Sequence, residues 1–123
     1  MGVPVIGCSC SVCKSTSPKD NRLRTSGLLT LENKTILVDC GPDFRQQALR
    51  HDIRHIDGVI LTHAHHDHTA GVDELRVFYM HSKEPLPCLL SKETASDIMK
   101  RFDYLFDPVL MKGRLVSKVD LLI

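Results

Sequence analysis

The chain has 123 residues, of which 42% are hydrophobic, and a formal net charge of +1. That length allows one domain with an ordinary apolar core. Basic and acidic residues are interspersed and only 5% of residues are aromatic, which argues against a sequence-specific DNA- or RNA-binding module. No apolar stretch is long enough to span a membrane, and no leader-like segment opens the chain, so we expect a cytoplasmic protein.

The first twenty residues are rich in Cys, Ser, Pro and Lys, a composition that predicts a loop. Within it, Cys8, Cys10 and Cys13 form a Cys-x-Cys-x2-Cys pattern, a spacing that suits the donation of three thiolates to one tetrahedral zinc ion. A fourth ligand must come from elsewhere, and Cys40 or Cys88 could serve only if folding brings one of them close. The alternatives are a disulfide or reduced thiols, and five cysteines without a signal peptide favour reduced thiols.

A β-hairpin is expected next, because the apolar runs 26–31 and 35–40 flank the polar turn Glu32-Asn33-Lys34. Arg22 and Arg24 precede this hairpin, and their guanidinium groups either bind a substrate phosphate or face solvent. A helix that starts with Pro42 in its first turn should then end near His51.

The second half of the sequence predicts further alternation of strands and helices. We expect a strand over 57–62, a helix over 71–80 and a short strand over 88–90. Ser91 should cap a helix that runs through Phe102 and has Ile98 and Met99 on its buried side. The tail, 109–123, alternates well enough for one or two strands around Lys112-Gly113.

The segment His63-Ala64-His65-His66-Asp67-His68 is the most informative part of the sequence. It lies between the predicted strand 57–62 and the predicted helix 71–80, and its polar side chains can converge only if the chain turns there. Imidazole and carboxylate are ligands that zinc, manganese and iron accept, and a His-x-His pair beside an Asp-His pair suits two metal ions that share one loop. Sites with two metal ions catalyse hydrolysis.

We therefore predict a metal site, and the alternative is a polar loop whose histidines are only solvated. The predicted ligands are His63, His65, Asp67 and His68. The remaining histidines stand alone in charged surroundings or outside the ligand pattern, and we expect them at the surface. These are His51, His55, His66 and His81.

The pattern His63-x-His65-x-Asp67-His68 after an apolar strand resembles the metallo-β-lactamase superfamily. The segments 2–13, 22–26 and 39–45 resemble the branch that contains phosphoribosyl cyclic phosphate phosphodiesterase, and the likeness runs from residue 2 to about residue 80. The resemblance implies a mixed α/β (α+β) fold, the N-terminal part of an αββα sandwich. It makes 1–123 a single partial domain, with a Cys-rich loop at 1–20 and a metal loop at 62–69. It also implies two divalent metal ions, zinc or manganese, and hydrolysis of phosphodiesters or cyclic phosphates in small phosphorylated substrates, although the fold alone fixes no substrate.

Carried over by position, His63 and His65 would bind the first metal ion and Asp67 and His68 the second. Asp67 would also act in catalysis by orienting the bridging hydroxide. Asp39 falls where the family has an acidic residue beside the metal loop, so it would hold a ligand histidine in place. The alternative for Asp39 is a turn or a helix cap.

Parts of the family pattern are missing from this sequence. The resemblance calls for an upstream strand with a Gly-Thr-Gly loop, a third histidine for the first metal ion, a bridging aspartate, a last histidine for the second, and a histidine that completes the structural zinc site. No histidine follows His81.

Two hypotheses follow from this incomplete pattern. The first is a metal-dependent hydrolase of the phosphodiesterase type. The second is a catalytically incomplete metal-binding half-domain, either a truncated product or a subunit whose partner supplies the missing ligands. A sandwich cut through its middle exposes one face of a sheet, so the second hypothesis also predicts marginal stability and self-association into homo-oligomers.

Overall fold

A sheet with the strand order β1-β2-β3-β4-β5 forms the centre of the computed structural model, which describes residues 1–112 and 119–123. Its strands are β1 (Gly27–Leu31), β2 (Lys34–Val38), β3 (Gly58–Ile60), β4 (Leu86–Leu89) and β5 (Val119–Leu122). The first two strands form an antiparallel hairpin, and β2 to β5 run parallel. Because the strand order never reverses, right-handed crossovers bring the connecting helices to the same face of the sheet.

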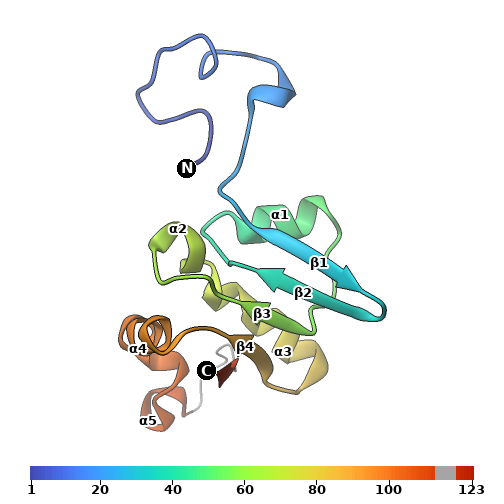
Figure 1. Ribbon diagram of the computed structural model, residues 1–123, viewed down its shortest axis with the longest axis vertical. Coiled ribbons are helices and arrows are strands. Elements are labelled where there is room, and N and C mark those ends of the chain that lie inside the picture. The colour runs from blue at the N-terminus through green and yellow to red at the C-terminus, as the bar shows by residue number, and fades with distance from the viewer. Residues whose placement is uncertain (113–118) are drawn as a thin grey trace.

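The helices are short, and α1 and α3 lie behind the sheet in Figure 1. They are α1 (Phe44–Arg50), α2 (His66–Thr69), α3 (Arg76–Ser82), α4 (Lys92–Arg101) and α5 (Pro108–Met111), with 3-10 turns at Pro18–Asp20, Val72–Leu75 and Asp103–Leu105. The longest helix, α4, begins as the sequence predicts, because the Ser91 side chain accepts a hydrogen bond from the Thr94 backbone N–H at 3.2 Å.

The hydrophobic core lies between the sheet and these helices. Leu37, Val59 and Cys88 are cross-strand neighbours on β2, β3 and β4, and each is at most 2% exposed. Phe44 of α1 and Phe78 of α3 belong to the same buried cluster, with ring centroids 6.3 Å apart. This face of the sheet therefore packs against the helices, except beside β1, where Leu28 is 42% exposed.

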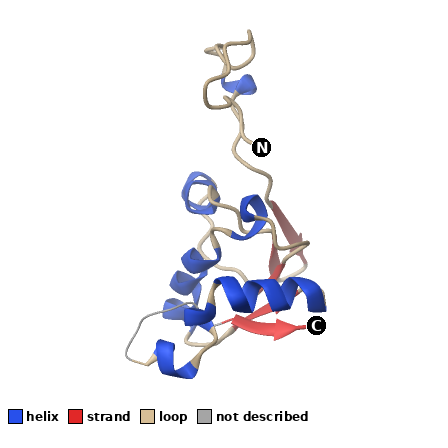
Figure 2. Cartoon of the chain, turned by 90° about the vertical axis from the view of Figure 1, so that its left-hand side faces the viewer, coloured by secondary structure: helices blue, strands red, loops and turns tan. Residues whose placement is uncertain are grey.

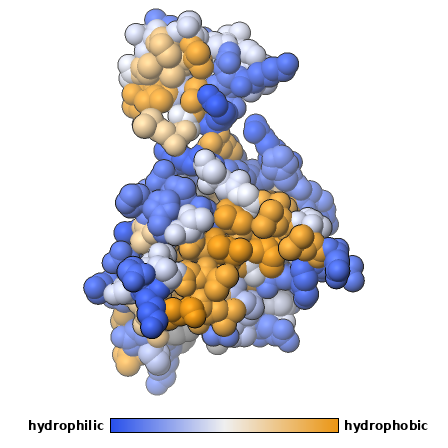
Figure 3. Space-filling view, viewed as in Figure 1, coloured by the Kyte–Doolittle hydropathy of each residue, from blue (hydrophilic) through white to orange (hydrophobic). Residues whose placement is uncertain are grey.

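The opposite face of the sheet is apolar and open to solvent. Cross-strand register assigns it Lys34, Pro87, Asp120 and seven aliphatic side chains, those of Leu29, Leu31, Ile36, Val38, Ile60, Leu89 and Leu122. Four of the aliphatic side chains, on β1, β4 and β5, are between 47% and 62% exposed. Figure 3 shows the resulting apolar patch across the strands. We call this surface the open sheet face.

Several predicted elements are confirmed: the hairpin, the helix after Pro42 and the helix capped by Ser91 all form. The expected strand over 57–62 is shorter, and the expected helix over 71–80 divides into a 3-10 turn and α3. Strand β4 starts at Leu86 and includes Pro87, which the sequence placed before the strand. The missing N–H of Pro87 is tolerated because β3 pairs only with Cys88 and Leu89.

Two other predictions are wrong. Met99 was expected inside the protein, but it is 48% exposed because α4 turns only a narrow stripe toward the core. The start of the tail is the helix α5 instead of a strand, since Pro108 occupies its first turn and the Asp107 carboxylate accepts a hydrogen bond from the Val109 N–H. The turn predicted at Lys112-Gly113 extends outside the described residues. One strand of the predicted tail, β5, does form.

Residues 1–20 project from the body of the molecule (Figure 2). The projecting segment forms a loop, as the sequence predicts, and contains one 3-10 turn. An antiparallel bridge between Val3 and Arg22 joins its start to the stretch that leads into β1. In the part of the chain that the structure describes, no helix is long and apolar enough to cross a membrane.

Candidate metal centre

The predicted metal ligands come together where β3 ends and α2 begins. The ring centroid of His63 lies 4.7 Å from that of His65 and 4.0 Å from that of His68. The Asp67 carboxylate is 3.8 Å from Nε2 of His68. The segment is not entirely a loop, because α2 starts at His66, which is exposed as expected.

A buried carboxylate supports this cluster from the end of β2. Asp39 is 4% exposed, and its Oδ2 is 2.7 Å from Nδ1 of His68. It also accepts hydrogen bonds from the backbone N–H and the hydroxyl of Thr62, both at 2.9 Å. The same hydroxyl is 2.9 Å from Nδ1 of His63. The Thr62 hydroxyl has a single proton, which it donates to Asp39. Its oxygen therefore accepts a hydrogen bond from the Nδ1–H of His63.

Asp39 therefore sets the tautomer of two histidines. With the proton of each ring on Nδ1, His63 and His68 present the lone pair of Nε2 to an ion. A neutral imidazole whose other nitrogen bonds a carboxylate or a polar group is the usual form of a metal-binding histidine. The donor chemistry of the cluster thus fits a divalent cation. The contact that sequence analysis expected of Asp39 is present, and its role in metal binding stays a prediction.

The metal loop packs closely on the connection between β2 and α1. The Cys40 N–H donates to the His68 carbonyl at 2.7 Å, and the Gly71 N–H donates to the Cys40 carbonyl at 2.8 Å. A Cβ atom at Gly41 would collide with the backbone carbonyl of Asp67. Only glycine fits this close approach, so the Gly41 position belongs to the architecture of the site.

The cluster supplies a partial set of ligands. Among the described residues, Cys8, Cys10 and Cys13 are the group of three whose ligand atoms all lie within 4.8 Å of one another, and the histidine motif does not gather its donors that closely. The motif brings its side chains together in pairs, consistent with a site that needs further ligands.

The three cysteines in the projecting segment form the second candidate site. The Cys13 N–H donates to Cys10 Sγ at 3.4 Å, and this contact is the main cause that lowers the pKa of Cys10 to about 7. A thiolate is the form that binds zinc. All five cysteines are free, so the disulfide alternative is not realised, and Cys40 and Cys88 lie in the core, where burial raises the pKa of both thiols.

The two arginines before the hairpin have different surroundings. Arg24 donates from Nη1 to the Asp43 carboxylate at 2.9 Å, and its backbone N–H donates to the same carboxylate at 2.7 Å. The backbone N–H of Arg24, then its guanidinium, lowers the pKa of Asp43. Arg24 therefore joins the segment before β1 to the N-terminus of α1. The side chain of Arg22 is exposed. A phosphate-binding role for either residue stays a prediction.

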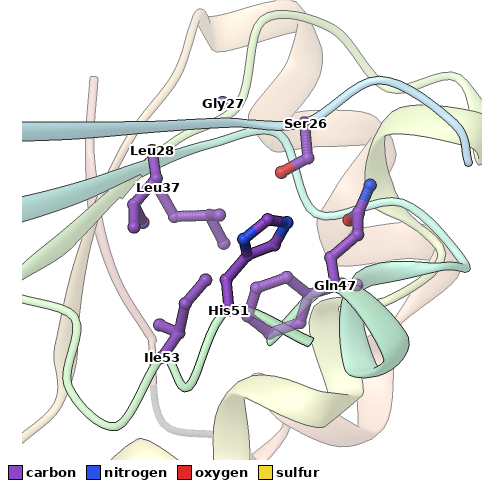
Figure 4. A pocket seen from close by; sticks show the side chains of 8 residues that line it. Ser26, Gly27, Leu28, Leu37, Gln47, His51 and Ile53 are labelled. Atoms are coloured by element: carbon purple, nitrogen blue, oxygen red, sulfur yellow. The ribbon is translucent and has the colours of Figure 1, made fainter. Parts of the chain in front are cut away.

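A separate cavity of about 300 Å³ lies between β1 and α1, and none of the predicted metal ligands lines it (Figure 4). His51, expected at the surface, is exposed and lines this cavity with Ser26 and Gln47. The expected surface position of His55 also holds, and its Nε2 is 3.3 Å from the Asp57 carboxylate.

Three residues that contact the motif escaped the sequence analysis. Thr62 and Thr69 flank the motif directly. Their hydroxyl groups, one on each side of the motif, are a sequence feature that could have identified them. Arg101 is 37 residues away from the carbonyl that it contacts, so no local pattern indicates it.

Residues 34–120 match the Beta-lactamase superfamily domain. A new diphosphatase from the PhnP family superposes with a TM-score of 0.84 at 36% identity, covering 99% of this chain and 46% of that one. The zinc-bound PqqB of Methylobacterium extorquens, 23% identical, shows the same fold with a TM-score of 0.66, covering 98% of this chain and 42% of its own. An octanoyltransferase of Porphyromonas gingivalis is 44% identical over 106 residues, which are 85% of this chain and 21% of that protein.

The chain therefore belongs to the β-lactamase superfamily, as its histidine motif predicts. The predicted fold class, a mixed α/β fold that forms part of the superfamily's sandwich, is confirmed. The chain spans less than half the length of these relatives, from 21% of the octanoyltransferase to 46% of the diphosphatase.

Proposed function

We propose that this chain carries part of the active site of a metal-dependent hydrolase that acts on small phosphorylated substrates, as a phosphodiesterase or a diphosphatase. The single observation that carries the proposal is the Asp39–Thr62 network, which engages Nδ1 of both His63 and His68 and so leaves the Nε2 atom of each ring available to an ion. The likeness to a diphosphatase at 36% identity supports the phosphate chemistry.

His63, His65, Asp67 and His68 would hold two divalent ions, zinc or manganese. A divalent ion bound there would act as a Lewis acid on a phosphoryl oxygen. The protein contributes by holding the rings in one tautomer and by keeping the Asp67 carboxylate near His68.

The test is hydrolysis of bis(4-nitrophenyl) phosphate by the full chain loaded with Zn²⁺ or Mn²⁺. We expect the wild type to release nitrophenolate faster than the His63→Ala variant does. His66→Ala is the matched control, because His66 is exposed and outside the ligand pattern. Equal rates for the wild type and His63→Ala would contradict the proposed activity.

A second candidate function, a non-catalytic metal-binding half-domain, is favoured by the open sheet face. Four of its apolar side chains are between 47% and 62% exposed, and exposed apolar patches mark interaction surfaces. In this candidate the face pairs with the same face of a second copy. Sedimentation should then give a dimer that Leu89→Glu dissociates, whereas a compact monomer at all concentrations would contradict the pairing.

A further inference from the structure

A guanidinium from α4 reaches the backbone of the histidine motif. Arg101 is the last residue of α4, and its Nη1 donates a hydrogen bond to the Ala64 carbonyl and another to the Thr69 hydroxyl, the latter at 3.2 Å. Ala64 lies between His63 and His65 in the chain. The contact therefore falls on the segment that carries the first two predicted ligands.

Thr69 extends this contact to a second carbonyl. The residue is fully buried, and its hydroxyl donates to the His65 carbonyl at 2.9 Å. Because the single proton of the hydroxyl is used in that bond, the oxygen accepts from Arg101. The carbonyls of Ala64 and His65 are thus both connected to α4 through one guanidinium.

The segment needs support from outside because it has little of its own. Helix α2 has only four residues, and its N-cap, His65, makes no side-chain capping bond. A single helical turn does not persist without tertiary contacts. Asp39 and Cys40 hold the His68 end of the segment. The Asp39–Thr62 network holds the His63 ring at the other end, and Arg101 holds the backbone between these two points.

Electrostatics alone would not favour a cation at this position. A guanidinium close to bound divalent ions repels them, so its charge opposes metal binding. A role in metal binding must therefore come from the geometry of its hydrogen bonds. Removing the charge of Arg101 would raise metal affinity, whereas removing its hydrogen bonds would lower metal affinity, so an experiment can separate the two effects.

We propose that Arg101 is a positioning residue, which fixes the backbone at Ala64 and His65 and thereby aims the His63 and His65 rings at a metal ion. The inference rests on the proposed metal site, and it adds a residue from a distant helix that acts through hydrogen bonds to the backbone.

The test is a Co²⁺ titration of the full chain followed by visible absorption. Arg101→Met should weaken the Co²⁺ affinity of the histidine site by about 10- to 100-fold, the usual effect of losing a group that orients a ligand. Lys100→Met removes the same charge from the exposed neighbouring residue and should leave the affinity unchanged or slightly higher. Arg101→Lys should restore part of the affinity, because an ammonium can still donate to Ala64.

Cobalt bound by the cysteines provides an internal control, because thiolates add a ligand-to-metal charge-transfer band in the near ultraviolet. That band should be identical in all variants. Affinity in Arg101→Met that equals or exceeds the affinity of the wild type would overturn the positioning role and leave the metal site intact. Failure of the wild type to bind Co²⁺ at the histidines would instead overturn the proposed function.

Hydrogen exchange of the metal-free chain tests the positioning role without metal. The His68 N–H donates to the His65 carbonyl at 3.0 Å, so it reports on the held segment. Its exchange should be faster in Arg101→Met than in Lys100→Met. Equal exchange in the two variants would overturn the inference even if no metal binds.

Discussion

Replacing Asp39 separates the role in metal binding that we propose for this carboxylate from its structural role. In Asp39→Asn, Oδ1 still accepts from the N–H of Thr62 at 2.9 Å and from its hydroxyl at 3.0 Å, while an NH2 group takes the place of Oδ2 beside His68. An NH2 group can only donate, so the His68 ring must turn Nδ1 into an acceptor and move its proton to Nε2. A protonated Nε2 cannot bind a metal ion.

The magnitude follows from the bonds that are lost. Asp39→Asn gives up one charge-assisted hydrogen bond at 2.7 Å, and the tautomer change recovers part of it, so the free energy of unfolding should fall by about 1–3 kcal/mol. Asp39→Ala leaves the donors of Thr62 and His68 unsatisfied. It also places alanine at a φ of 60°, for a total loss of roughly 3–5 kcal/mol. Metal affinity should fall about 10- to 100-fold in Asp39→Asn.

Urea unfolding of the metal-free chain, followed by circular dichroism, measures the first effect, and Zn²⁺ titration measures the second. Asp97→Asn is the matched control, since it removes one negative charge from an exposed position on α4. Zinc affinity in Asp39→Asn that stays within about twofold of the control would refute the tautomer argument.

Three further variants test other parts of the structure. Gly41→Ala should lower the free energy of unfolding by about 1–3 kcal/mol in urea melts, because its Cβ meets the metal loop, whereas Gly27→Ala, with only an ordinary contact at 3.6 Å, should be nearly neutral. The Lys34 ammonium lowers the pKa of Asp57, so their interaction stabilises the fold above about pH 4 and is lost as the pH falls below it. Asp57→Asn should therefore flatten the acid side of the stability profile, and an unchanged profile would contradict this. Ser91→Ala should lower the melting temperature by removing a cap worth about 1 kcal/mol.

The parts of the fold that depend on local patterns could be predicted from the sequence. The hairpin and the helix capped by Ser91 follow from turn residues and from one side-chain hydrogen bond. The position of the metal motif after an apolar strand follows from periodicity. Errors came where the outcome depends on packing, as with the exposed Met99, or on a proline at a helix start, as in α5.

The candidate site was only partly accessible from sequence. The ligand pattern His63-x-His65-x-Asp67-His68 is contiguous, so spacing alone indicated it. The hydrogen bonds that orient the rings were not predictable, because they link segments far apart in the chain. Asp39 was found only through resemblance, and Arg101 was not found at all.

Zinc content per chain in native mass spectrometry tests most directly whether the histidine motif binds metal. Wild type and a His63→Ala/His68→Ala double variant are compared after the same zinc loading and desalting. Because the Cys-rich loop is identical in both, any difference belongs to the histidine motif. We expect the wild type to hold at least one more zinc ion than the double variant. Equal zinc content in the two proteins would contradict the account.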